Sequence, residues 1–193
     1  MFSLLQNKTT KPLGNLLKGD VSIDFLDRPI SSFQSSQMVF NTVPHYAIEK
    51  DLAFLLAKKE VITFGAHYVL ISAEQDTPLE QFEHAIFQLQ LKGYVPVLVH
   101  AEQYMLLQNS YKHVERLLNR GGLLSVDLLS LSGYRGKAAK TLAERLFKEE
   151  EVSFVDTSIQ TQEEEKLLRK LLSSKTITKY LQSKMIRNRE LSV

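Results

Sequence analysis

The chain has 193 residues, of which 44% are hydrophobic, 24% charged and 9% aromatic, and its formal net charge is +2. This composition excludes wholesale disorder, and the length suits one domain with a real core. No apolar run approaches the ~20 residues that span a bilayer. Because cysteine is absent, a disulfide framework, a thiolate zinc site and a cysteine nucleophile are excluded. The near-zero charge argues against nucleic acid as a partner.

The N-terminus gives no indication of secretion. Met1-Phe-Ser-Leu-Leu-Gln-Asn-Lys8 contains neither a long apolar run nor a small-residue cleavage site. We therefore expect a cytoplasmic protein without a membrane span. We also expect a single domain over residues 1–193, with a poorly ordered N-terminal extension over 1–20 and a C-terminal tail over 186–193.

Secondary structure in the first half is predicted mainly from periodicity. Val21-Ser-Ile-Asp-Phe25 alternates and predicts a short strand. Leucines at helical spacing predict a helix over 51–59, and short apolar runs predict strands over 61–64 and 68–71. Thr77-Pro-Leu-Glu80 predicts a helix start with a capping box. This helix is expected to end at Gly93 and to bury Leu79, Phe82, Ile86 and Leu89.

The second half alternates strands and helices. Strands are predicted over 94–100, 123–128 and 152–156, and helices over 110–120, 137–149, 162–172 and 176–185. Such an order implies right-handed β-α-β crossovers and an α/β fold with a parallel sheet. Periodicity leaves open whether the sheet is open or closed into a barrel. The glutamate runs at 149–151 and 163–165 are expected on solvated helix surface.

Parallel α/β folds place their sites at the carboxyl ends of strands, and the corresponding positions here are Ser72, His100–Tyr104, Asp127–Ser130 and Asp156–Gln160. His100 ends an apolar strand and is followed closely by Glu102, Gln103 and Tyr104. Its imidazole could serve as a metal ligand or a general base. The simpler interpretation is a partly buried histidine bonded to a neighbouring carbonyl. An aspartate at a strand end, such as Asp156, caps a turn more often than it catalyses.

Other local motifs favour structural roles. None of the remaining histidines, His45, His67, His84 and His113, has a second ligand at metal-binding spacing. Gly133-Tyr-Arg-Gly136 precedes a helix, where backbone N–H groups and Arg135 could hold an anion. An ordinary loop-to-helix junction explains this segment more simply. Phosphate-binding, nucleophile-elbow and zinc-protease motifs do not occur in the sequence.

Several segments, taken in order, resemble one family. Gly93–Tyr104 is similar to G-Y-x-P-V-L-A-H-P-E-R-Y, Leu128–Gly136 to S-L-x-G-Y-Y-G, and Phe154–Gln160 to F-V-G-T-D-x-H. Residues 56–65 and 87–93 also match. Over about residues 45 to 180, the chain resembles the bacterial manganese-dependent protein-tyrosine phosphatases of the PHP superfamily, the CpsB/YwqE type of capsule and exopolysaccharide loci.

This resemblance implies a distorted (β/α) barrel that hydrolyses phosphotyrosine with a metal-bound hydroxide. Clustered divalent cations repel one another unless several carboxylates and imidazoles surround them, and an arginine would hold the phosphate. Since the portion between Asp24 and Glu49 is short for this family, we expect a PHP-like barrel that is truncated or incomplete on its N-terminal side.

Most of the family's site residues are replaced in this sequence. His100 is retained, but Gln103 stands where the family has its phosphate-binding arginine. Positions at which the family has other metal ligands carry Ser72, Ser158 and Gln160. The losses fall on polar site residues, while the core pattern and the glycines persist. This selectivity indicates a folded protein that has lost its chemistry.

The remaining metal-ligand candidates are His100, His45, Asp24 and Asp156. Asp24 falls in the first motif, where the family has a histidine. His45 aligns either with the histidine of T-P-H or, without a gap, with a ligand glutamate. Asp156 stands where the family has glycine. One or two imidazoles are not expected to hold a multinuclear manganese centre, so we expect no cofactor, with manganese as the alternative.

Three hypotheses follow. The first is a catalytically inactive relative with a binding or regulatory role, whose partner is a tyrosine kinase or an active paralogue. The second is a working phosphatase or phosphoesterase with a reduced metal site, and the third is a structural or oligomerising protein. Under the first, the old active-site face would bind the partner, with Arg135 as a phosphate- or partner-binding residue. This vestigial site comprises His100, Glu102, Gln103, Tyr104, Ser72, Ser158 and Gln160.

Overall fold

The computed structural model describes residues 17–23, 41–49, 52, 56, 58, 61–65, 67–157, 159 and 161–188, with side chains described from residue 44 onward. The expectations for residues 1–16 and for Asp24, Ser158 and Gln160 lie outside this part. Within it, no helix combines the length and the apolar character needed to cross a membrane.

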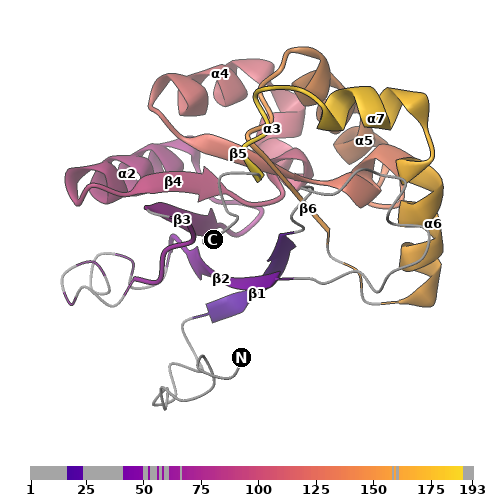
Figure 1. Cartoon of the computed structure of the whole chain (residues 1–193). Helices are drawn as coiled ribbons and strands as arrows, with labels where there is room; N and C mark the ends of the chain where they lie inside the picture. Colours follow the sequence, from indigo (N-terminus) through magenta and orange to yellow (C-terminus); the bar gives the residue numbers. More distant parts are fainter. Residues whose placement is uncertain are drawn as a thin grey trace, which may run out of the picture.

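A single curved sheet forms the framework, with its strands in the order β1 to β6 (Figure 1). β1 pairs antiparallel with β2, and every later pair is parallel, as the alternating pattern predicts. β1 also approaches β6, so the sheet curls toward a barrel. The strands are β1 (Leu17–Ile23), β2 (Asn41–Ala47), β3 (Tyr68–Ser72), β4 (Val95–Leu98), β5 (Leu123–Asp127) and β6 (Phe154–Asp156).

Helices cover the outer face of this sheet (Figure 1). The α-helices are α2 (Leu79–Leu91), α3 (Met105–Asn109), α4 (Tyr111–Asn119), α5 (Lys137–Lys148), α6 (Gln162–Leu172) and α7 (Lys175–Leu181). Two 3₁₀ turns, η2 (Ala101–Gln103) and η3 (Leu128–Ser132), follow β4 and β5 directly. The sequence predicted the longer helices but neither α3 nor the two 3₁₀ turns. The buried residues of η2 and η3 are consecutive, so they show no helical periodicity in the sequence.

Strand residues alternate between two hydrophobic clusters. Val69 and Ile71 of β3 face the helices, whereas Tyr68 and Leu70 lie in a smaller cluster on the other face. In the smaller cluster the ring of Phe154 lies 5.1 Å from that of Tyr68, centroid to centroid. These aromatic rings fill the concave side of the sheet below the carboxyl ends of the strands.

Two local expectations are wrong. Residues 61–63 are not a strand. Phe64 makes one antiparallel bridge to Tyr68 because the chain reverses at Gly65, which has a φ of 53°. The capping box expected at Thr77 is also absent, because the Thr77 hydroxyl donates to the Glu49 carboxylate instead. The end of this helix at Gly93, where φ is 81°, is confirmed.

A capping box does form at α6. Thr161 accepts a hydrogen bond from the backbone N–H of Glu164, whose side chain in turn accepts one from the N–H of Thr161. Glu164 is only 4% exposed. The expectation of a solvated surface is therefore wrong for this member of the 163–165 run.

Candidate functional site

A polar layer lies at the carboxyl ends of the parallel strands, above the aromatic cluster. Ser72 ends β3, His100 follows β4, and Asp127 and Asp156 are register partners at the ends of β5 and β6. Both aspartates are buried, with exposed fractions of 0% and 1%. The strand-end position expected from the sequence is therefore where the buried charges gather.

His100 and Asp156 form the central ion pair. The Nε2 atom of His100 lies 2.9 Å from Oδ1 of Asp156, and Ser125 donates its hydroxyl to the other carboxylate oxygen. Burial alone would lower the pKa of His100, but the negative charge and hydrogen bond of Asp156 outweigh it and raise the pKa to about 9. At neutral pH the imidazole is thus protonated. The backbone of His100 is left-handed, with a φ of 51°, which turns the chain from β4 into η2.

Arg135 is held by two carboxylates. Its Nε atom lies 2.8 Å from Oδ2 of Asp127, and its Nη1 atom lies 3.4 Å from Oε1 of Glu164. Asp127 also accepts a hydrogen bond from the N–H of Leu129 at 2.9 Å. Burial and the nearby Asp156 charge raise the pKa of Asp127, whereas Arg135 and His100 oppose the rise. The guanidinium is therefore held in place by two carboxylates of the protein.

Glu102 is completely buried beside His100. Its Oε1 atom accepts hydrogen bonds from the Ser130 hydroxyl at 2.7 Å and from the Gln103 amide at 3.2 Å. Burial raises the pKa of Glu102 to about 7, although the His100 charge opposes this shift. Its Oε2 atom has no hydrogen-bond partner among the described residues. This buried carboxyl group is thus part of the polar layer, and its pKa is raised toward neutrality.

The other candidates lie at the edges of this layer. Tyr104 is buried, accepts a hydrogen bond from the N–H of Ala73 at 3.0 Å, and packs edge-on against Phe82, which makes it a structural residue. Burial also raises the pKa of its hydroxyl. The Ser72 hydroxyl is buried without a hydrogen-bond partner in the described part of the chain. His45 lies on β2, which β3 separates from β4.

These residues do not fit a multinuclear metal centre. His100 and Asp156 are bonded to each other, and both oxygens of Asp127 already accept hydrogen bonds. A hydroxyl, that of Ser72, stands where a ligand carboxylate is expected. Among the described residues, no group of three or more His, Cys, Asp or Glu side chains is arranged to hold a metal ion.

Sequence reasoning missed part of the network. Ser125 and Glu164 supply a hydrogen bond and a charge to its members, whereas Ser130, which binds Glu102, lies in a strand-end range that the sequence did indicate. The Thr161-Gln-Glu-Glu164 segment does carry a capping-box pattern from which the burial of Glu164 could have been expected. Ser125 lies on an apolar strand, where the sequence carries no comparable pattern.

Comparison with known proteins now adds the family. The profile of the family described as capsular polysaccharide synthesis, CpsB/CapC, matches residues 34–189. The chain belongs to the CpsB/CapC family. The CpsB/YwqE-type resemblance stated from the sequence motifs is thereby confirmed.

Individual relatives agree with this membership. The CpsB/CapC chain is 29% identical over 109 residues to the tyrosine-protein phosphatase YwqE of Bacillus subtilis (strain 168), an alignment that covers 56% of this chain and 41% of that protein. It thus spans about two-fifths of the length of this curated relative. The chain also matches a solved structure with a TM-score of 0.54 and 25% identity. That structure comes from a report on YwqE from Bacillus subtilis and CpsB from Streptococcus pneumoniae, which describes them as unique metal-dependent tyrosine phosphatases. That match covers 74% of this chain and 62% of the other.

Proposed function

We propose that this chain is a non-catalytic member of the CpsB/CapC family that acts by binding a protein partner in capsule or exopolysaccharide synthesis. The observation that carries the proposal is the ion pair between His100 and Asp156, 2.9 Å apart. His100, the one family ligand that is clearly retained, is protonated, and its positive charge is balanced by the carboxylate of Asp156 at the end of β6. In this protein a proton on the imidazole replaces the metal as the positive charge.

The protonation state supports this proposal. An imidazolium has no lone pair on Nε2, so a metal ion could bind only after displacing the proton and the Asp156 contact. With the pKa of His100 raised to about 9, this displacement is unfavourable at neutral pH. Ser72, unlike a carboxylate, has no negative charge that would attract a metal ion and so favour this displacement. The charged layer therefore stabilises the fold rather than catalysing hydrolysis.

Phosphate recognition is also weakened. Gln103 replaces the arginine of the family motif, and its amide donates to Glu102. Arg135 is bound by Asp127 and Glu164. We therefore propose that the partner is recognised as a folded protein and not through phosphotyrosine hydrolysis. A tyrosine kinase or an active paralogue is the proposed partner, and a cytoplasmic location remains a prediction.

The test measures metal content, turnover and partner binding together. Protein prepared with and without manganese is analysed for bound metal and assayed on a phosphotyrosine peptide. We expect substoichiometric metal and no turnover, alongside saturable binding to the kinase or active paralogue of the same locus by titration calorimetry. Stoichiometric manganese together with turnover that is lost in His100→Ala would overturn the non-catalytic assignment. Absence of binding to both proteins would overturn the binding role.

A further inference from the structure

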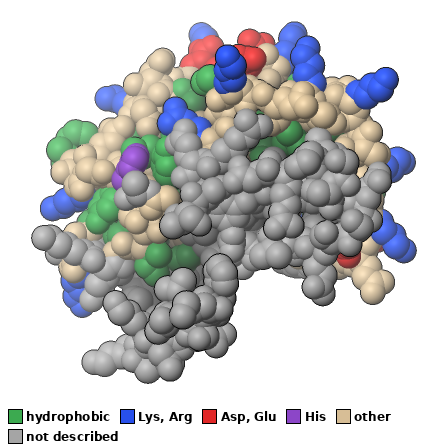
Figure 2. All heavy atoms as spheres, in the orientation of Figure 1, with side chains coloured by type: hydrophobic (Ala, Val, Ile, Leu, Met, Phe, Trp, Pro, Cys, Tyr) green, Lys and Arg blue, Asp and Glu red, His purple; other side chains and the backbone are tan. Residues whose placement is uncertain are grey.

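The outward face of α2 carries large apolar side chains. Phe87 is 54% exposed and Leu91 is 62% exposed, and they lie one helical turn apart. Figure 2 shows hydrophobic side chains at the surface over this end of the molecule. Exposed apolar residues that are neighbours on one helix are typical of an interaction surface.

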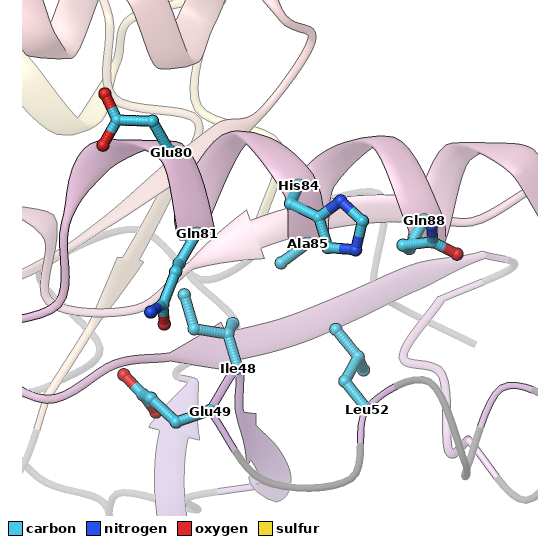
Figure 3. Close-up of a pocket in the computed structure, with 8 residues that line it drawn as sticks. All are labelled: Ile48, Glu49, Leu52, Glu80, Gln81, His84, Ala85 and Gln88. Atoms are coloured by element: carbon cyan, nitrogen blue, oxygen red, sulfur yellow. The ribbon is translucent and has the colours of Figure 1, made fainter.

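Beside this face lies a pocket of about 330 Å³ between α2 and the segment after β2. Figure 3 shows Ile48 and Leu52 pointing toward α2, where Ala85 completes an apolar floor. Polar side chains form the rim of the pocket: Glu49, Glu80, Gln81, His84 and Gln88. The same helix therefore presents two protruding apolar side chains, Phe87 and Leu91 (the knobs), and borders a pocket with an apolar floor (the hole).

Charge is distributed unevenly along α2. Glu80 lies in its first turn and Glu49 lies nearby at the pocket rim, whereas Lys92 follows its last residue. A third acidic residue of α2, Glu83, lies one turn before Phe87, and its charge is paired with Arg116 of α4 at 2.8 Å. The pocket end of the face is thus acidic and the opposite end basic.

We propose that this surface, formed by α2 and the adjoining pocket, binds a second copy of the chain, with the two α2 helices antiparallel about a twofold axis that passes between His84 and Gln88. With 1.5 Å rise per residue, this arrangement places Lys92 of one copy over Glu80 of the other. Phe87 then lies over Ala85 at the middle of the pocket, and Leu91 lies near Gln81 at its Ile48 end. Each copy supplies both knob and hole, as a closed twofold interface requires.

The second copy is the occupant that charge complementarity selects. A twofold partner brings its basic end to the acidic end, and it does so twice per dimer. One helix and its adjoining pocket form a small interface compared with the ~800 Å² per partner of a typical stable complex, so we expect a concentration-dependent equilibrium. This surface is separate from the His100–Asp156 layer, so the inference does not depend on the proposed function.

The test is a charge swap read by sedimentation equilibrium over a range of protein concentrations. Glu80→Lys and Lys92→Glu should each weaken dimerisation by roughly tenfold, because each change removes two symmetry-related pairs and introduces repulsion. The double variant should regain most of the lost affinity. Phe87→Ser should abolish the dimer. Unchanged circular dichroism and melting temperature would establish that these exposed changes leave the fold intact.

Matched controls are Glu115→Lys on α4 and Lys179→Glu on α7, which make the same changes in net charge away from α2 and should leave the dimer unaffected. A protein that stays monomeric up to millimolar concentration would overturn the inference. So would a dimer that resists all three single changes, or a double swap that dimerises no better than either single swap.

Discussion

At the scale of single residues, the imidazole of His100 is one of the positive charges of a buried, charged layer. It lies 2.9 Å from Asp156 in a layer where Asp127 and Glu102 are also buried. Ionised carboxylates in such a layer would repel one another strongly without a cation. The protonated imidazole and the guanidinium of Arg135 supply that positive charge, so protein side chains provide the charge balance.

The first prediction concerns pH. An imidazole whose pKa rises on folding, here from 6.5 to about 9, stabilises the fold fully below pH 6.5 and loses this contribution as the pH rises through 9. The pKa of Glu102 is raised from 4.5 to about 7, so this group also makes the free energy of unfolding fall as the pH rises between those two values. The free energy of unfolding from urea titrations should therefore fall between pH 5 and pH 9, by about 3 kcal/mol from His100 alone.

The direction of this dependence separates two states of the site. A metal bound to His100 would be released by acid, so stability would rise with pH over the same range. In His100→Gln, the portion of the decrease between pH 6.5 and 9 should disappear. Stability that increases from pH 5 to pH 9 would contradict the protonated ion pair.

The second prediction removes the partner of the imidazole. Asp156→Asn should destabilise the protein by about 3 kcal/mol, because it leaves a charged group without its buried counter-ion. Chemical denaturation at pH 7 measures this loss. The control is Glu165→Gln, which breaks an exposed pair with Arg169 and should cost no more than about 0.5 kcal/mol. Equal costs for the two variants would mean that the buried pair contributes little.

At the scale of elements, α6 supports the site from outside the strand ends. Its capping box places Glu164 against Arg135, which in turn holds Asp127 at the end of β5. A helix start and a buried ion network are thus connected through one glutamate. Disturbing the cap should therefore affect more than local helicity.

The third prediction measures how much the cap of α6 contributes to stability. Thr161→Ala removes the cap of α6 and should cost about 1 kcal/mol of unfolding free energy. Ser174 occupies the N-cap position of α7 but makes no side-chain capping bond there, so Ser174→Ala should change stability by less than half as much. Thermal denaturation of both variants measures the difference. A larger loss in Ser174→Ala would show that the bond at Thr161 is not the stabilising feature.

At the scale of the whole molecule, the fourth prediction is that folding does not require a metal. A ligand that binds the native state at one hundred times its dissociation constant adds about 2.7 kcal/mol of stability. We expect the melting temperature to stay within about 1 °C whether EDTA or excess manganese is added. The metal-dependent relative YwqE is the positive control. A melting temperature that rises steadily with manganese would contradict a metal-free fold.

The global fold was largely predictable from local patterns. Hydrophobic spacing and the stop at Gly93 predicted α2 and its buried residues, and the apolar run before His100 predicted β4. Capping was less predictable, since Thr77 and Thr161 both precede a glutamate by three residues. Only the second forms the box, because Glu49, distant in sequence, binds the first.

The position of the candidate site was predictable from the sequence, but the ion pairs between its residues were not. Parallel topology brings His100 and Asp156 to the same end of the sheet, and sequence motifs identified both residues. Their mutual contact depends on strand order and on the left-handed turn at His100, which no periodicity encodes. The commitment of Arg135 to Asp127 likewise depends on how η3 leads from β5 to that arginine.

The end of the sheet at β6 is closed by a side chain. Asn188 is fully buried, and its amide accepts from the N–H of Val155 at 2.9 Å and donates to the carbonyl of Val155 at 2.8 Å. It thereby imitates the peptide group of another strand. An uncovered strand edge invites pairing between molecules and leads to aggregation. Asn188, which lies in the stretch predicted from the sequence to be a tail, therefore occupies the hydrogen-bonding groups of Val155 with which a strand of another molecule could otherwise pair.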